Sequence, residues 1–356
     1  MKKTAVSEYG FINAKLRARI SSMLTDEFKT ALIGADGIEA AVQVLSSYGY
    51  SKASEKWNTT GDIQSLEFEL FKNHIANYSM VMKNTDGSLN GLINVLSIKP
   101  EIENIKSVLR LWYGSKLRHS PINYRSAYII RERIRENIDW NELINAVSYE
   151  DIISVFSSTI YSEIFNNEAV IDTGDSLFNV EILLDKLYYR MVIEESYKLK
   201  KNDNDTLNEI ISTEIDLQNV SWIIRYRHFY KMDTSKLSSI LIPGGHGLNI
   251  ELMDNISKEE GAGFAPMEIL KKSYPELSSL NISNKHNFSA QARLFEQLLD
   301  ETRKRKFTTI LTGYPFTIGV VLAYFFISER ELRFISSVIN GKNYKFSSDT
   351  IKEMIR

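Results

Sequence analysis

"EIENIKSVLR", at positions 101–110, is nearly repeated by "DLQNVSWIIR" at positions 216–225. Both stretches begin with an acid, place Asn fourth and Arg tenth, and put aliphatic residues second, fifth, eighth and ninth. They lie 115 positions apart, and a further 115 positions lead to "ELRFISSVIN" at 331–340. The third stretch keeps the acid and the aliphatic residues but has Phe334 and Asn340 in place of the Asn and the Arg. The sequence therefore predicts three copies of one unit.

Two further features recur around these core motifs in a fixed order. A turn that ends in Tyr comes first, in "LSSYGY" (45–50), "FSSTIY" (156–161) and, more loosely, "LKKSY" (270–274). An acidic and apolar segment follows, in "LEFELF" (66–71), "VEILLD" (180–185) and "FEQLLD" (295–300). This period is far longer than the roughly 20–50 residues of a solenoid repeat, so each copy is expected to be a helical subdomain. The expected division is 1–145, which includes an N-terminal helix, then 146–260 and 261–356.

Helical periodicity dominates the chain, and alternating strand patterns are nearly absent. Apolar residues recur at helical spacing in segments such as "SLEFELFKNHIANYSMVM" (65–82) and "YRSAYIIRERI" (124–134). Stretches such as "KP" (99–100), "KKNDNDT" (200–206) and "IPGGHG" (242–247) are expected to separate helices. The uncharged segment "FTIGVVLAYFFI" (316–327) is shorter than the roughly 20 residues of a membrane span and is expected to form a buried helix. The predicted fold class is all-α.

Composition excludes several functional classes. The chain has 356 residues, of which 43% are hydrophobic and 25% charged, as in ordinary globular proteins. A net charge of −2 gives no indication of nucleic-acid binding, and the absence of Cys excludes disulfides and thiolate metal sites. The beginning "MKKTAVSEYGFINAKLRARI" has no apolar segment behind its lysines, so we expect no secretory signal and a cytoplasmic location.

The polar residues of the core motifs are predicted to be structural. They are Glu101, Asn104, Arg110, Asp216, Asn219, Arg225 and Glu331. An Asn beside an apolar helix face usually bonds the backbone of a neighbouring helix. Arg110 and Arg225 are expected to pair with an acid of an adjacent helix, with Glu67, Glu69 and Glu181 as candidates. A residue that recurs in every copy fits the architecture of the copy better than a single active site.

Catalytic and metal motifs are not found in the sequence. The five His residues share no ligand spacing, and "PGGHG" (243–247) lacks the Lys of a phosphate-binding loop and is interpreted as a helix stop. "RKRK" (303–306) is interpreted as a solvated face, with an acidic partner as the alternative. We therefore expect no catalytic, cofactor-binding or metal-binding residue, no cofactor and no small-molecule substrate.

Taken together, the start "YGFINAKLRARISSML", the turns that end in Tyr, the core motif and the ending "YFFISERELRFISSVINGK" resemble one family. This is the central-stalk subunit of V-type ATPases, called C in bacteria and archaea and d in eukaryotes. The resemblance covers almost the whole chain. The third copy departs from it at Phe334 and Asn340, and His246 interrupts the Pro-Gly-Gly turn.

The resemblance implies a rotor part without catalytic activity of its own. Members sit on the cytoplasmic end of a membrane proteolipid ring and receive the foot of the central shaft, one copy per complex, in machines that move protons or other ions. Three like subdomains around a pseudo-threefold axis would form a funnel-shaped socket for the shaft. Two alternatives remain open. One is an all-α adaptor of three modules with other partners, and the other is a helical hydrolase with a carboxylate and His site.

Overall fold

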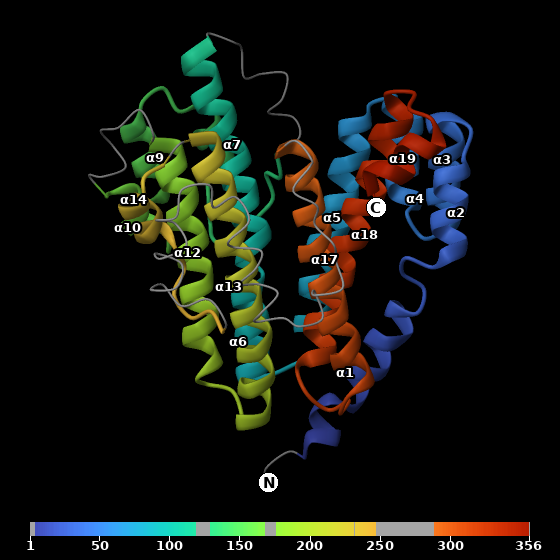
Figure 1. The fold of residues 1–356 in the computed structure, drawn as a ribbon, viewed down its shortest axis with the longest axis horizontal. Coiled ribbons are helices and arrows are strands. Elements are labelled where there is room, and N and C mark those ends of the chain that lie inside the picture. Colours follow the sequence, from blue (N-terminus) through green and yellow to red (C-terminus); the bar gives the residue numbers. More distant parts are fainter. Residues whose placement is uncertain (1–3, 119–128, 168–175, 231, 247–287, 356) are drawn as a thin grey trace. The chain divides into compact units, whose positions relative to one another are not determined.

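The computed structural model describes residues 4–118, 129–167, 176–230, 232–246 and 288–355. Every regular element in these ranges is a helix, which confirms the all-α class (Figure 1). The helices are α1 (Ala5–Ile20), α2 (Asp26–Gly34), α3 (Gly37–Ser47), α4 (Ser51–Thr60), α5 (Ile63–Met82), α6 (Gly87–Leu96), α7 (Ile98–Arg118), α8 (Trp140–Asn145), α9 (Tyr149–Phe156), α10 (Ser162–Phe165), α12 (Ser176–Ser196), α13 (Lys201–Tyr230), α14 (Thr234–Ile240), α17 (Phe288–Thr312), α18 (Gly319–Asn343) and α19 (Ser348–Ile355). Within the described ranges, none of these helices combines the length and the apolar character of a membrane span.

The chain folds into two compact units. The first consists of Met1–Tyr188 together with Tyr324–Arg356, and the second of Tyr189–Ala323. The helices α12 and α18 each run from one unit into the other. The division into three copies remains a prediction from the sequence.

Local sequence signals start several helices of the first unit. Asp62 accepts hydrogen bonds from the backbone N–H groups of Gln64 and Ser65 at the start of α5. Ser148 and Asp151 form a capping box at the start of α9, each side chain bonding the backbone N–H of the other. Such caps satisfy N–H groups that have no partner within the helix.

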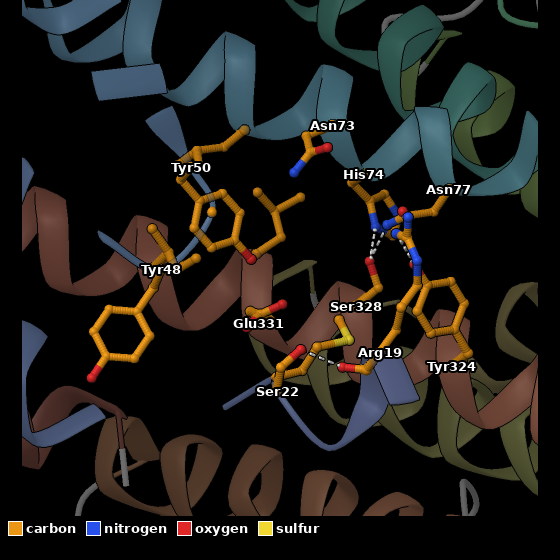
Figure 2. Close-up of a pocket in the computed structure, with 15 residues that line it drawn as sticks. Arg19, Ser22, Tyr48, Tyr50, Asn73, His74, Asn77, Tyr324, Ser328 and Glu331 are labelled. Carbon is orange, nitrogen blue, oxygen red and sulfur yellow. Dashed lines mark hydrogen bonds between the residues drawn. The ribbon is translucent and has the colours of Figure 1, made fainter. Parts of the chain in front are cut away.

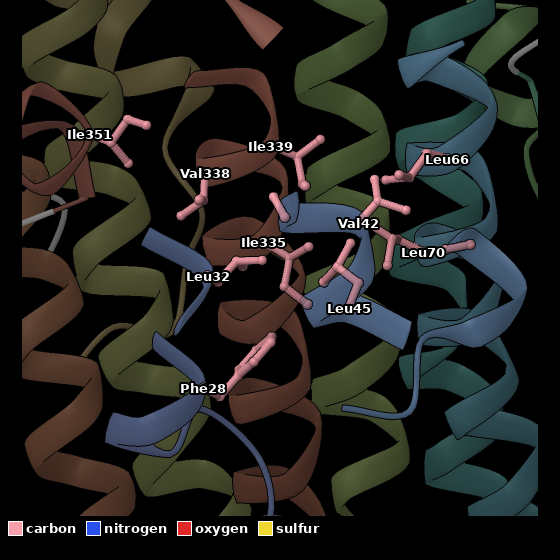
Figure 3. Packing of buried hydrophobic residues seen from close by; sticks show 12 residues of the cluster. Phe28, Leu32, Val42, Leu45, Leu66, Leu70, Ile335, Val338, Ile339 and Ile351 are labelled. Atoms are coloured by element: carbon pink, nitrogen blue, oxygen red, sulfur yellow. The ribbon is translucent and has the colours of Figure 1, made fainter. Parts of the chain in front are cut away.

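An apolar cluster at the end of α18 joins the N-terminal and C-terminal parts of the first unit (Figure 3). It joins the N-terminal helices α2 to α5 with α18 and α19, and its fully buried members include Leu32, Leu45, Leu66, Ile339 and Ile351. At about 25 cal/mol per Å² of apolar surface, burial of this many large side chains is the dominant stabilising contribution here. The C-terminal helices are therefore packed against the N-terminal ones.

The second unit is built on the long helix α13. Its buried face includes Leu207 and Ile215, and it packs against α17. The Asp203 carboxylate accepts a hydrogen bond from the Ile318 N–H at 3.0 Å, just before α18 begins. Of the uncharged segment 316–327, residues from Gly319 on belong to α18, and residues 318–326 are all buried. The expected core helix is therefore confirmed from Gly319 on, whereas 316–318 precede it.

Two expected helix boundaries and one expected helix were wrong. α7 begins at Ile98, so Pro100 lies in its first turn, where a backbone N–H would have no helical partner in any case. α13 begins at Lys201, within the expected break. The negative charge of Asp203 in its first turn stabilises the helix through the positive end of the helix dipole. Residues 129–134, expected to be helical, are irregular. Backbone groups of this segment hydrogen-bond a side chain of α7 instead of one another.

Candidate functional site

Two asparagines of the core motifs each hydrogen-bond both the backbone N–H and the backbone carbonyl of one loop residue. Asn104 donates to the carbonyl of Ile130 at 2.9 Å and accepts from its N–H at 3.1 Å. Asn219 does the same with Ile242, at 2.8 Å for both bonds. Both Asn side chains are buried, so each amide satisfies a loop residue that water does not reach. The partner is a loop in both cases, whereas the sequence interpretation assumed a helix.

The acid one turn before each Asn bonds the same loop further along. Glu101, fully buried, accepts hydrogen bonds from the backbone N–H groups of Arg135 at 2.7 Å and Glu136 at 2.9 Å. Asp216 accepts one from the His246 N–H at 3.1 Å. Acid and Asn together form what we call a helix–loop clamp, defined by Glu101 with Asn104 and by Asp216 with Asn219.

The third copy has a modified clamp. Glu331 accepts a hydrogen bond from the Leu24 N–H at 3.2 Å, in the turn between α1 and α2, where Leu24 has a φ of 49°. Phe334, in place of the Asn, packs edge-on against Phe28 with ring centroids 6.3 Å apart. The clamped segment is thus N-terminal to the motif and not C-terminal, and an aromatic contact replaces the amide.

Contacts between copies follow the order of the sequence repeat. The Tyr161 hydroxyl, from the second copy, donates to Glu101 of the first at 2.6 Å. Tyr50 of the first copy lines the same pocket as Glu331 of the third, and burial together with the neighbouring Glu331 carboxylate raises the pKa of its hydroxyl. Burial raises the pKa of both carboxyls, while the tyrosine hydroxyls beside them lower it. The turns that end in Tyr therefore supply equivalent side chains to equivalent acids.

Contacts between the tenth position of one motif and the acidic segment of another copy follow the same order. Arg110 of the first copy pairs with Glu181 of the second at 2.6 Å, as the sequence predicted. Asn340 of the third copy donates to Glu67 of the first at 2.5 Å. Glu181 and Glu67 occupy the same place in their acidic segments. Burial raises the pKa of Glu67, and the Asn340 amide only partly offsets this.

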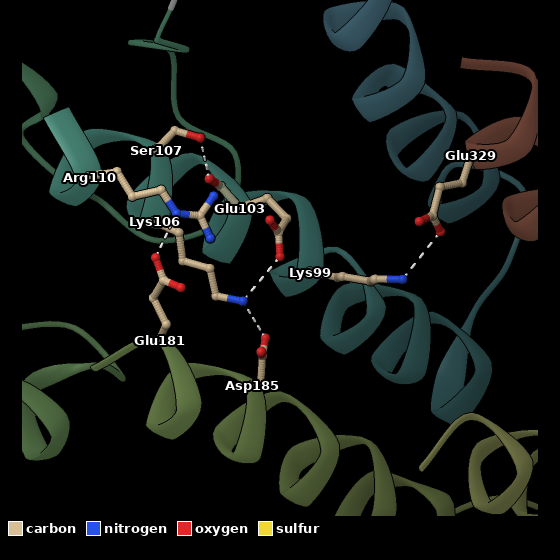
Figure 4. A network of polar contacts seen from close by, with 8 residues as sticks. All are labelled: Lys99, Glu103, Lys106, Ser107, Arg110, Glu181, Asp185 and Glu329. Atoms are coloured by element: carbon tan, nitrogen blue, oxygen red, sulfur yellow. Dashed lines mark hydrogen bonds and ion pairs between the residues drawn. The ribbon is translucent and has the colours of Figure 1, made fainter. Parts of the chain in front are cut away.

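A charged network surrounds the Arg110 contact (Figure 4). Lys106 of α7, which is buried, reaches Asp185 of α12 at 2.5 Å and Glu103 at 3.2 Å. Lys99 pairs with Glu329 of α18 at 3.2 Å. Burial would raise the pKa of Glu329, but Lys99, Arg333 and His74 together lower it to about 2.

The basic run at 303–306 is paired within the chain. Arg303 bonds Glu214 of α13 at 2.9 and 3.0 Å. Lys304 and Arg305 both pair with Glu301, and Lys306 reaches Glu209 of α13. Each of these cations forms an ion pair with an acid of the same chain, so the run is not an unpaired basic surface. Arg225 is exposed, and its expected acid partner remains a prediction.

The first unit contains a small polar pocket of about 160 Å³ (Figure 2). A chain of hydrogen bonds crosses it, from Arg19 to the Tyr324 hydroxyl, to Asn77, to Ser328 and to Nδ1 of His74. The Ser328 oxygen accepts from Asn77 and shares a further hydrogen bond with Nδ1 of His74, in which the donor depends on the tautomer of the ring. Burial, the largest cause, lowers the pKa of His74 to about 4. The hydrogen bonds of this chain join α1, α5 and α18.

The predicted residues do not gather at one place. Glu101 and Asn104 meet one loop, Asp216 and Asn219 another, and Glu331 a third segment. No group of His, Asp and Glu with metal-binding geometry occurs in the described part of the chain. Sequence reasoning missed the tyrosine partners, although their recurrence at the end of each turn was a usable signal. It also missed the His74 network, for which no repeat gives a signal.

Comparison with known proteins gives a consistent result. The model of the family described as ATP synthase (C/AC39) subunit matches residues 12–354. The C subunit of the A-type ATP synthase of Methanococcoides burtonii is 23% identical to this chain, over 98% of this chain and 94% of the relative. The proteins of the same name from Methanosphaera stadtmanae and Pyrococcus furiosus are 23% and 22% identical, over 98% of this chain and 87% and 90% of their own lengths.

Proposed function

Because the chain belongs to the ATP synthase (C/AC39) subunit family, we propose that it is the non-catalytic rotor component that couples the central shaft of a rotary ATPase to the membrane proteolipid ring. Each complex contains one copy of the chain. It lies on the cytoplasmic face and is held to the membrane through the ring. The complex as a whole transports protons or other ions. The three copies surround a pseudo-threefold axis and form a funnel-shaped socket for the foot of the shaft.

One observation carries the socket proposal: contacts connect successive copies in cyclic order, and at two of the three junctions the residues in contact occupy equivalent positions. Tyr161 and Glu181 of the second copy meet the first core motif, and Tyr50 and Glu67 of the first copy meet the third. Between the second and third copies, α13 and α17 are joined by Arg303 and Glu214. An order of first to second, second to third and third to first is the order that closure around an axis requires. A string of modules, as in an adaptor, would not need the last of these contacts.

The polar contacts also suit torque transmission. A coupling element must resist deformation, and buried, fully bonded polar groups between packed helices give a unique and stiff arrangement. The helix–loop clamps likewise join the long helices α7 and α13 to loops through buried, hydrogen-bonded side chains. Such a role needs no nucleotide binding by the chain itself.

The test is reconstitution of the coupling. Membranes that contain the ring are mixed with shaft subunits, with and without this protein, and the shaft retained on the membrane is measured. We expect retention only when the protein is present, and weaker retention at high ionic strength, since partner surfaces exposed to water before assembly are largely polar. Equal retention without the protein would overturn the rotor proposal. Binding of unrelated partners, with no affinity for ring or shaft, would favour the adaptor.

A further inference from the structure

The helix α1 has apolar residues on two opposite sides. On the inner side, Tyr9, Ile12 and Leu16 are buried. The opposite side consists of small and apolar residues, and we call it the outer face of α1: Val6, Gly10, Phe11, Ala14 and Ala18. Positions 6, 10, 14 and 18 follow one another at successive turns of the helix, and position 11 lies beside 14 and 18. None of these five residues is charged.

The outer face is open to solvent in spite of its composition. Phe11 is 67% exposed and Val6 56%, and Ala14 and Ala18 are exposed as well. A Cβ built on Gly10 would have nothing of the described chain within 4 Å. A surface helix normally presents polar and charged residues to water, whereas a helix that is apolar on opposite sides is normally covered on both. The outer face therefore has the composition of a surface that another body covers.

The same end of the chain is positively charged. Residues 1–20 contain one acid, Glu8, and five cations: Lys2, Lys3, Lys15, Arg17 and Arg19. The whole chain, by contrast, has a net charge of −2. The Lys15 ammonium lies 5.7 Å from the ring centroid of Phe11, at the edge of the outer face. Arg19 donates to the Tyr324 hydroxyl, a neutral group that leaves the charge of the guanidinium in place. The body that covers the outer face is therefore expected to be both apolar and negatively charged.

The helix is held in place before any partner binds. Arg19 bonds Tyr324 of α18 at 3.3 Å, and Glu331 of α18 accepts a hydrogen bond from the Leu24 N–H in the turn that follows α1. The outer face is thus presented on an ordered helix, so binding through it requires little further ordering of the chain.

We propose that the outer face of α1 binds the surface of an anionic lipid bilayer. The helix lies in the plane of the interface, with Phe11 and Val6 among the upper acyl chains and the neighbouring cations at the headgroup phosphates. Such a surface is apolar and negatively charged over a flat area. The remainder of the chain has a net negative charge and is repelled, so this end alone faces the lipid. The inference does not depend on the rotor assignment. A protein with an acidic rim is the competing occupant, and the experiment separates the two.

The experiment is co-sedimentation of the full chain with protein-free vesicles. One set contains phosphatidylcholine alone, and the other contains about 30% phosphatidylglycerol as well. We expect at least about fivefold more bound protein on the anionic vesicles at about 0.05 M NaCl, and loss of most of this difference at about 0.5 M.

Matched variants assign the binding to α1. Phe11→Ser should lower the affinity for anionic vesicles about five- to tenfold, because the ring no longer leaves water. Lys15→Glu should lower it about tenfold or more, because it replaces an attraction by a repulsion. Tyr344, which is also 67% exposed, and Lys52 of α4 lie toward the other end of the first unit (Figure 1). Tyr344→Ser and Lys52→Glu should therefore change the affinity by less than about twofold. Thermal unfolding checks that all four variants remain folded.

A fluorescent label reports which surface meets the lipid. Because the chain contains no Cys, one introduced thiol carries the label at a single position. An environment-sensitive dye on Ala14→Cys should shift its emission to shorter wavelength when anionic vesicles are added, and the same dye on Tyr344→Cys should not.

Three outcomes would overturn the inference. The first is no binding to anionic vesicles, and the second is binding that leaves the dye at position 14 and the affinity of Phe11→Ser unchanged. The third is an effect of Phe11→Ser on binding to ring-containing membranes without any binding to vesicles, which would assign the outer face to a protein partner. Because the vesicles contain neither ring nor shaft, each of these results leaves the rotor proposal to its own test of shaft retention.

Discussion

At the scale of single residues, Asn219 does more than a typical buried amide. It satisfies both the N–H and the carbonyl of Ile242, a residue that is itself 2% exposed. Removing the side chain leaves two backbone groups without a partner in an apolar environment. The cost of such groups, and not the lost bonds alone, sets the expected effect.

We therefore predict that Asn219→Ala lowers the free energy of unfolding by about 1–3 kcal/mol. Arg225→Ala is the control on the same helix. Because Arg225 is exposed, its removal should change stability by no more than about 0.5 kcal/mol. Chemical denaturation of the three proteins measures both values. An effect of Arg225→Ala as large as that of Asn219→Ala would show that its guanidinium has a buried partner after all.

His74 gives the molecule a defined response to acid. Its folded pKa, about 4, lies below the ordinary value of about 6.5, chiefly through burial, with Lys99 acting in the same direction and Glu329 opposing. Between these two pH values the unfolded chain binds a proton that the folded chain does not. The contribution of neutral His74 to the free energy of unfolding is therefore complete above about pH 6.5, and it is lost as the pH drops toward 4.

We predict that this loss amounts to no more than about 3 kcal/mol and is absent in His74→Gln, whose side-chain amide can donate to or accept from Ser328 and does not titrate. The difference between the two proteins is the quantity to follow, because the raised pKa values of Glu67, Glu101 and Glu331 act in the opposite direction. Urea denaturation at intervals from pH 4 to 7.5 measures it. Parallel curves for parent and variant would rule His74 out.

At the scale of elements, the sequence predicted most helices because their apolar faces recur at helical spacing. It mispredicted 129–134, where the spacing is also helical, because the competing partner lies far away in the chain. Asn104 and Glu101 bond the backbone of this loop and favour an irregular path over a helix. Periodicity describes a segment alone and has no information about a donor 26 residues earlier. The repeat located the clamp residues, but only the structure identified what they clamp.

The contact of α18 with α19 depends on a glycine. A Cβ at Gly341 would lie 2.7 Å from Cγ1 of Ile351, which is fully buried in the apolar cluster. We predict that Gly341→Ala lowers the free energy of unfolding by about 1–3 kcal/mol, because α19 must shift to make room. Gly114→Ala, also within a helix and with nothing within 4 Å of the added carbon, should be neutral or stabilising by up to about 1 kcal/mol. Thermal or chemical unfolding compares them, and equal effects would contradict the packing argument.

At the scale of the whole molecule, the three copies are most informative where they diverge. Repetition explains why Glu181 and Glu67 meet equivalent positions, while the exchange of Arg for Asn explains why the two junctions differ. Repetition of one unit within a single chain permits such divergence, which identical subunits of a symmetric oligomer do not. The socket proposed above would need such divergence in order to hold a shaft without threefold symmetry.

The last prediction separates closure of the molecule from its stability. Ile339 of α18 and Ile215 of α13 are both fully buried, but only Ile339 lies in the apolar cluster between the third copy and the first. Replacing either by Ala should cost about 2–5 kcal/mol through lost burial and the cavity left behind. Only Ile339→Ala should also lower retention of the shaft on ring-containing membranes, since it loosens the packing of the third copy against the first, which the proposed socket needs, and not merely the fold. Retention is measured at a temperature where both variants remain folded, as judged by their unfolding curves. If the two variants of matched stability retain the shaft equally well, closure between the third copy and the first does not govern coupling, and the socket must hold the shaft through another part of the chain.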